Sequence, residues 1–146
     1  MNSKQSCFYT IASDIKNICP VIEEILNFFD NAYGKLSECC KFDLKVILNE
    51  LITNAIRHGN KSMESSKVQI YADVIEDKCI IKITDEGSGF NPVEKISVAL
   101  EKKANEELLD FCETGRGLLI VKSLADSVMF NKKGNSITVV KSLKHL

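Results

Sequence analysis

The sequence has little of several features that would indicate a specialised class of protein. It contains no tryptophan, two prolines and two histidines in 146 residues, and its net charge is −1. That balance gives no electrostatic reason to expect binding to nucleic acid or to a membrane surface. No apolar run approaches the roughly 20 residues that span a bilayer, and the N-terminal residues lack the apolar core of a signal peptide. We therefore expect a cytoplasmic protein without direct nucleic-acid or membrane contact.

The six cysteines lack the spacing of a metal site. They contain no C-x-x-C pair, and the adjacent pair Cys39 and Cys40 suits neither a shared tetrahedral site nor an easy disulfide. We expect reduced thiols that pack as small apolar residues, and no metal held by cysteine. The full set is Cys7, Cys19, Cys39, Cys40, Cys79 and Cys112.

The remaining composition is that of an ordinary globular protein, with 45% apolar and 27% charged residues. A chain of this length buries about two-thirds of its unfolded surface. We expect one domain over residues 1–146.

One stretch, residues 44–60, organises the chain. Its apolar residues recur at helical spacing and cover most of the helix surface, as in a buried helix. Glu50, Asn54 and His58 follow one another at intervals of four, so they share one side of that helix. They are either an exposed polar stripe or a buried polar line that needs partners. Gly59 and Asn60 end the pattern, as a left-handed cap would.

The other segments alternate between strand and helix patterns. A strand over 8–12 precedes a helix that starts near Pro20, after a cap at Ser13 or Asp14, and ends at Gly34. Residues 35–41 are a loop or the first turn of the central helix. A hairpin is expected over 68–74 and 79–84, a helix over 118–125, and a final hairpin over 128–131 and 136–143.

This order predicts an α/β two-layer sandwich, with a mixed, mainly antiparallel sheet and helices on one face. Residues 93–113 are helix-prone but dense in charge, with few spaced apolar anchors. We expect this segment to be mobile and solvated.

Two glycine motifs are weak signals when each is taken alone. Asp85-Glu-Gly-Ser-Gly89 is compatible with a simple turn after a strand. Gly115-Arg-Gly117 is either a flexible entry to a helix or part of a loop whose free N–H groups face an anion. The chain has no G-x-x-x-x-G-K-[ST] phosphate-binding loop.

Together and in this order, the motifs are far more specific. A helix with E-x-x-x-N, a strand ending in D-x-G-x-G and G-x-G opening a later helix resemble the GHKL ATP-binding (Bergerat) fold over most of residues 8–143. Within that superfamily, the stretches NELITNAIRHGN, ITDEGSGFNP and GRGLLIVKSLADSV look closest to bacterial anti-sigma-factor serine/threonine protein kinases. The resemblance implies that ATP and Mg²⁺ are cofactors and that residues 93–113 are an ATP lid.

The resemblance implies side-chain roles at three positions. Glu50 is the expected general base, and Asn54 is the expected Mg²⁺ ligand through its amide oxygen. Asp85 is expected to accept the amino proton of adenine. His58 matches the NAxxHG ending of the family motif, and a supporting hydrogen bond is its expected role.

The resemblance also implies backbone contacts at both glycine motifs. Gly87 and Gly89 are expected beside the adenine and ribose. The phosphates are expected at the start of the later helix, where the contacting residues are Gly115, Arg116, Gly117 and Leu118.

Two departures from the family pattern bear on activity. Several kinases of the family carry a basic residue just before the second glycine motif, where this chain has Cys112, Glu113 and Thr114. Arg116, or the lysines at 102 and 103, are alternative sources of that charge. Asn135 stands where the family commonly has threonine.

The resemblance therefore implies an anti-sigma factor that sequesters a sigma factor and phosphorylates a STAS-type anti-anti-sigma protein. A homodimer is implied as well, with the early strand and helix as the contact region. The alternative is a nucleotide-gated binding module without efficient kinase activity. An ATPase domain detached from a sensor histidine kinase is disfavoured, because no phosphoacceptor helix hairpin precedes residue 8.

Overall fold

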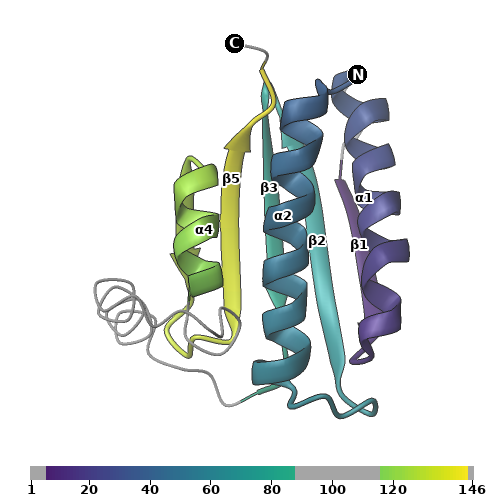
Figure 1. The fold of residues 1–146 in the computed structure, drawn as a ribbon, viewed down its shortest axis with the longest axis vertical. Coiled ribbons are helices and arrows are strands. Elements are labelled where there is room, and N and C mark those ends of the chain that lie inside the picture. Colours follow the sequence, from purple (N-terminus) through teal and green to yellow (C-terminus); the bar gives the residue numbers. More distant parts are fainter. Residues whose placement is uncertain (1–5, 88–115, 145–146) are drawn as a thin grey trace.

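The protein has two layers, a five-stranded sheet and a layer of helices on one of its faces (Figure 1). The computed structural model describes residues 6–87 and 116–144. Gly89, Gly115 and the expected lid at 93–113 lie outside the described residues. The strands are β1 (Ser6–Ala12), β2 (Lys67–Ile75), β3 (Lys78–Thr84), β4 (Ser127–Phe130) and β5 (Ser136–Ser142).

The strand order in the sheet is β1-β2-β3-β5-β4, which makes β3 the central strand. All four pairings among the described strands are antiparallel. Alternation along β2 sets the two faces, because Val68, Ile70, Ala72 and Val74 are buried and the residues between them are not. The predicted two-layer sandwich with helices on one face is confirmed.

The first helical segment follows the sequence signals closely. Asp14 accepts a hydrogen bond from the N–H of Lys16 and caps a short 3₁₀ helix, η1 (Ile15–Asn17). Helix α1 (Ile18–Tyr33) follows, with Pro20 in its first turn, where proline is tolerated. Gly34 ends α1 at a φ of 120°, a conformation that L side chains rarely adopt.

Helix α2 (Glu38–Asn54) lies across the middle of the sheet, between α1 and α4 (Arg116–Leu124) (Figure 1). It begins where the Ser37 hydroxyl accepts from the N–H of Cys40, so residues 38–41 are its first turn rather than a loop. Its buried side faces the sheet, whereas Phe42, Lys45 and Asn49 are exposed. The helix is therefore amphipathic, and the prediction of a buried helix that is covered on most of its surface is wrong.

The predicted left-handed cap at Gly59-Asn60 is wrong. The chain continues from α2 into one π-helical turn, η2 (Ala55–Gly59), in which the N–H of Asn60 donates to the carbonyl of Ala55 at 2.8 Å. Asn60 itself has a φ of −96°. The left-handed residues come later, at Lys61 and Ser62. The cap is not needed because the buried side chain of Asn60 fixes the end of the helix through contacts described below.

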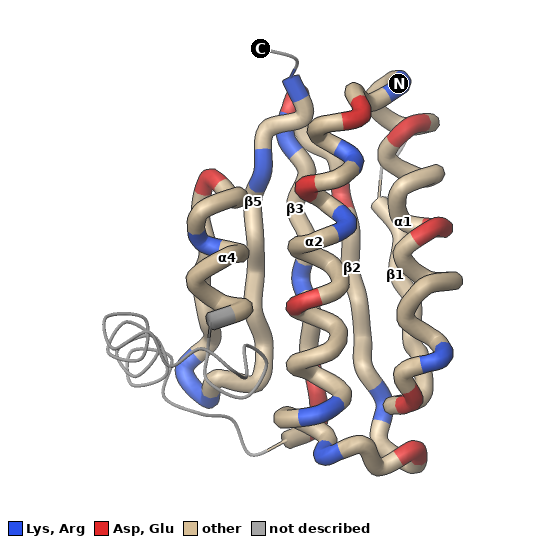
Figure 2. Tube along the Cα trace, viewed as in Figure 1, with Lys and Arg blue, Asp and Glu red and all other residues tan. Residues whose placement is uncertain are grey.

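Basic and acidic residues are interspersed over the described part of the fold (Figure 2). This arrangement matches the balanced composition and offers no broad patch of one sign for a polyanion. Among the described helices, none is long and apolar enough to cross a membrane.

Candidate functional site

Asp85 follows directly on β3 and is held from several directions. Its backbone N–H donates to the carbonyl of Asn135 at 2.9 Å, and its carboxylate Oδ1 accepts from the N–H of Gly87 at 2.7 Å. The side chain is half-buried, and this burial raises the pKa of the Asp85 carboxyl, although the Gly87 hydrogen bond and the charge of Lys133 act in the opposite direction. The result is a fixed carboxylate at the end of the central strand.

Two glycines make room for that carboxylate. A Cβ on Gly59 would overlap the carboxyl group of Asp85, and a Cβ on Gly87 would overlap the backbone carbonyl of Gly59. The Gly59 carbonyl is part of the backbone, and the Asp85 carboxylate is held by the N–H of Gly87, so a displacement of either would be costly. Gly59 is a site residue that sequence reasoning missed, because its motif position was interpreted as a helix end.

Glu50 meets the start of α4 in a second close contact. A Cβ on Gly117 would overlap Oε1 of Glu50, so this glycine lets α4 approach α2 at the carboxylate. Oε1 of Glu50 is buried and receives no hydrogen bond from any described residue. Burial raises the pKa of the Glu50 carboxyl above its usual range. A buried acceptor of this kind is costly unless a ligand uses it.

Asn54 is the last residue of α2 and lies one helical turn beyond Glu50. Its side chain is half-buried. Along the helix it therefore falls between the Glu50–Gly117 contact and the Gly59–Asp85 contact. His58 is half-buried in the π turn that follows.

The side chain of Asn60 connects three segments beside the site through hydrogen bonds. Its Nδ2 donates to the Ser13 hydroxyl at 2.8 Å and to the carbonyl of Lys67 at 2.9 Å, and its Oδ1 accepts from the N–H of Glu86 at 2.7 Å. These partners lie after β1, at the start of β2 and after β3. One buried amide thus fixes Glu86, the residue after Asp85, relative to the end of β1 and the start of β2.

The structure brings the predicted residues together in two groups. Glu50 with Gly117 is one group, and Asp85 with Gly87 is the other. Leu118 is buried in the core, so its side chain anchors α4. Arg116 begins α4, and its side chain is not among those described.

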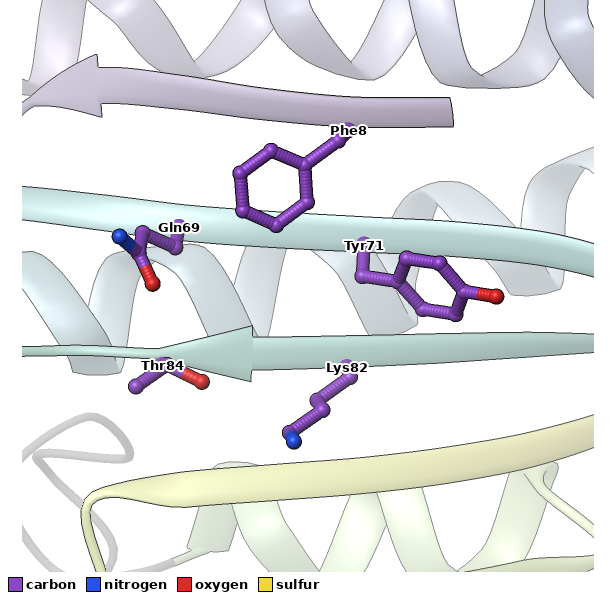
Figure 3. Close-up of a pocket in the computed structure, with 5 residues that line it drawn as sticks. All are labelled: Phe8, Gln69, Tyr71, Lys82 and Thr84. Atoms are coloured by element: carbon purple, nitrogen blue, oxygen red, sulfur yellow. The ribbon is translucent and has the colours of Figure 1, made fainter. Parts of the chain in front are cut away.

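A separate hollow lies on the opposite face of the sheet (Figure 3). It has a volume of about 330 Å³ and is lined by Phe8, Gln69, Tyr71, Lys82 and Thr84. None of these residues belongs to either group above, so the hollow is distinct from the candidate site.

The sequence that forms these two groups matches a known protein family. The family model for the histidine kinase-like ATPase domain matches residues 12–141, which include every residue of both groups. The chain belongs to this family. It is also 32% identical, over 105 residues, to the serine-protein kinase RsbW of Staphylococcus aureus strains bovine RF122 / ET3-1, MRSA252 and JH9. That match covers 70% of this chain and 65% of each relative, so it spans less than two-thirds of their length.

The residues of this histidine kinase-like ATPase domain fit an adenine nucleotide and its metal. Asp85 supplies a hydrogen-bond acceptor, and the absence of a side chain at Gly59 leaves space for it, because a Cβ on Gly59 would overlap the carboxyl group. Oε1 of Glu50 is a buried acceptor without a described donor, and Asn54 offers an amide oxygen of the kind that Mg²⁺ accepts. Membership of an ATPase family is compatible with nucleotide binding at these two groups.

Proposed function

We propose that this chain is a Mg²⁺–ATP-binding anti-sigma factor with serine/threonine protein kinase activity. The observation that carries the proposal is the buried Oε1 of Glu50 against Gly117, to which no described residue donates. In the second group, Asp85 lies between Gly59 and Gly87. The similarity to a serine-protein kinase supports the choice of a serine hydroxyl as acceptor.

Binding is assigned to the Asp85 group and Asn54. The carboxylate of Asp85 accepts a hydrogen bond from the adenine amino group, and a base without that donor leaves the carboxylate unpaired. Gly87 and Gly89 keep side chains away from the base and ribose. Asn54 holds Mg²⁺ through its amide oxygen, and the residues from Gly115 to Leu118 place N–H groups near the phosphates.

Transfer is assigned to Glu50. Bound Mg²⁺–ATP supplies the γ-phosphoryl group and a metal that offsets its charge. Glu50 accepts the proton of the attacking serine hydroxyl while the new oxygen–phosphorus bond forms and the bond to ADP breaks. The raised pKa of Glu50 makes its ionised form a stronger proton acceptor. The close contact between Gly117 and Glu50 helps to exclude water from the Glu50 carboxylate on the side of α4.

The proposed partners are proteins in the cytoplasm. A sigma factor is sequestered, and a STAS-type anti-anti-sigma protein competes for the complex and is inactivated by phosphorylation. A second copy of the chain is proposed on the helix-free side of the sheet, with β1 at the contact. Exposed apolar side chains on that side, of which Phe8 at 60% exposure is one, support this assignment. Helix α1, which the resemblance also placed in the contact region, lies on the opposite face of the sheet (Figure 1).

A nucleotide-gated binding module without efficient transfer is the second candidate. It is favoured by one observation, the absence of a basic residue at positions 112–114 before the second glycine motif. In this case ATP binding changes partner affinity, and Glu50 has no chemical role.

The first experiment is a calorimetric titration of the purified chain with ATP, with and without Mg²⁺. Asp85→Asn should weaken ATP binding by at least about tenfold, because an amide nitrogen or a reoriented amide oxygen replaces one carboxylate acceptor. Asn54→Ala should remove the Mg²⁺ dependence. Asp126→Asn, at an exposed residue after α4, is the matched control and should bind as wild type does. Absence of adenine-nucleotide binding in the wild type would contradict the proposal.

The second experiment separates the kinase from the binding module. Wild type and Glu50→Ala are incubated with Mg²⁺–ATP and a STAS-domain protein encoded in the same genome, and phosphate on the partner is measured by mass spectrometry. The kinase proposal requires modification by wild type and none by the variant. Release of a sigma factor without phosphate on the partner supports the module.

A further inference from the structure

Asn131 organises the turn between β4 and β5. Its Oδ1 accepts three backbone N–H bonds, from Gly134 at 2.8 Å, Asn135 at 3.1 Å and Ser136 at 3.2 Å. Three donors on one oxygen leave no ambiguity about which end of the amide faces the turn. The Nδ2 group of Asn131 must therefore point the other way.

That Nδ2 group meets the side chain of Asn135. It donates to Oδ1 of Asn135 at 2.7 Å, which fixes the orientation of the second amide as well. Nδ2 of Asn135 then donates to the backbone carbonyl of Asp85 at 2.9 Å. The two amides form a directed chain from the turn to the residue that follows β3.

Both backbone polar groups of Asp85 form hydrogen bonds with Asn135. Its N–H donates to the carbonyl of Asn135, and its carbonyl accepts from the Asn135 amide. The regular β3–β5 pairing ends at Thr84 and Ser136. The backbone N–H of Asn135 donates to Asn131 instead, so the Asn135 side chain supplies the donor to the Asp85 carbonyl.

We propose that Asn135, oriented by Asn131, is a positioning residue that sets the preference of the site for adenine by fixing the backbone of Asp85. This inference rests on the proposed role of Asp85 in adenine binding. It also gives a physical role to the residue that departs from the family pattern. A threonine hydroxyl is one bond shorter than the asparagine amide, and its single oxygen would have to serve both as donor to Asp85 and as acceptor from Asn131.

The test compares ATP with inosine triphosphate, which lacks the adenine amino group, by calorimetric titration of the full chain. Asn135→Asp keeps the size of the side chain but cannot donate to the Asp85 carbonyl. Asn131→Asp keeps the acceptor for the three turn N–H groups, removes the donor to Asn135 and adds one negative charge. Each variant should lose about tenfold in ATP affinity, with inosine triphosphate affinity unchanged.

The ratio of the two affinities separates positioning from general damage. Partial unfolding lowers the binding of both nucleotides equally, so it leaves the ratio as in wild type. Asn27→Asp, at an exposed residue of α1, introduces the same charge away from the site and should keep the wild-type ratio.

Either of two results would overturn the inference, and they have different meanings. If wild type prefers ATP but both variants keep that preference, Asn135 has no positioning role and the proposed function stands. If wild type itself does not distinguish the two nucleotides, or binds neither, the proposed role of Asp85 fails and the inference fails with it.

Discussion

Glu50 shows a conflict between stability and function at the scale of a single residue. Its Oε1 is buried beside Gly117 without a described donor, and burial is the cause of its raised pKa. In the unfolded chain the same carboxyl is solvated and has an ordinary pKa near 4.5. The folded state therefore binds the Glu50 proton more tightly than the unfolded state does, and ionisation of Glu50 opposes folding.

We expect Glu50→Gln to stabilise the fold at neutral pH, by an amount on the order of 1 kcal/mol, or a few degrees in melting temperature. The advantage should shrink as the pH falls through the raised pKa and should vanish below about pH 4.5, where wild-type Glu50 is protonated in both states. Thermal unfolding followed by circular dichroism across this range measures it. Glu23→Gln, at an exposed position of α1, is the control and should show no such dependence. A variant that melts below wild type at pH 7 would contradict this account.

The positions of the candidate site residues can be named from the sequence, whereas the contacts among them cannot. Glu50, Asn54 and Asp85 stand at fixed offsets in local motifs, so their positions could be named. Gly59 matters because it touches Asp85, which lies 26 positions later in the chain, and no local pattern reports such a contact. Asn135 stands out in the sequence only as a departure from the family pattern, because its partner Asp85 lies 50 positions earlier, directly after β3.

At the scale of elements, the end of α2 carries the largest difference between expectation and structure. A glycine followed by asparagine usually indicates a left-handed cap, and the local sequence offers no competing signal. The π turn forms because Asn60 is bound by Ser13, Lys67 and Glu86, which come from three other segments. Tertiary contacts thus overrule a local preference, and they do so beside the site.

The two close glycine contacts allow a paired test of these elements. Gly59→Ala should displace the Asp85 carboxyl, so ATP affinity should fall by tenfold or more while inosine triphosphate affinity changes little. Gly117→Ala should displace Glu50 and α4, so the affinities for both nucleotides should fall together. Calorimetric titration of the two variants measures both effects. Equal losses for both nucleotides in Gly59→Ala would show that the base end of the site had been misassigned.

At the scale of the whole molecule, the described helices all cover one face of the sheet, and none of them lies on the other (Figure 1). A single row across that other face contains Phe8, Tyr71, Lys82, Thr138 and Met129, in register from β1 to β4. Phe8 and Met129 are 60% and 58% exposed. Lys82 in this row and Asp73 in the next supply both signs of charge, as a self-complementary interface requires.

We expect the chain to be a dimer through this face and Phe8→Lys to shift it to monomer. Phe8→Lys adds one lysine to each chain, and a symmetric dimer would have to bury both charges at a cost in desolvation, so the dimer should weaken by at least about tenfold. Sedimentation velocity over a range of concentrations measures the shift. Phe42→Lys, on the exposed outer side of α2, makes the same change on the helical face and should leave the dimer intact. A wild-type chain that sediments as a monomer at high concentration would contradict the assignment.

The fold class was predictable because each strand and helix carries its own periodic signal. Alternation in β2 and the caps at Asp14 and Ser37 are local features that survive in the structure. The strand order was not predictable in the same way. The pairing of β3 with β5 passes over α4 and β4, and only packing across the whole sheet selects it.

The central position of β3 has a consequence for how the protein meets its ligand. Both edges of this strand are paired, so its amide hydrogens should exchange with solvent only through the largest opening motions of the molecule. Asp85 extends directly from that strand and is pinned by Asn135 and by the turn at Gly87. In the proposed binding role of Asp85, recognition at this end of the site would begin from a preorganised surface, and little ordering entropy would be lost there on association.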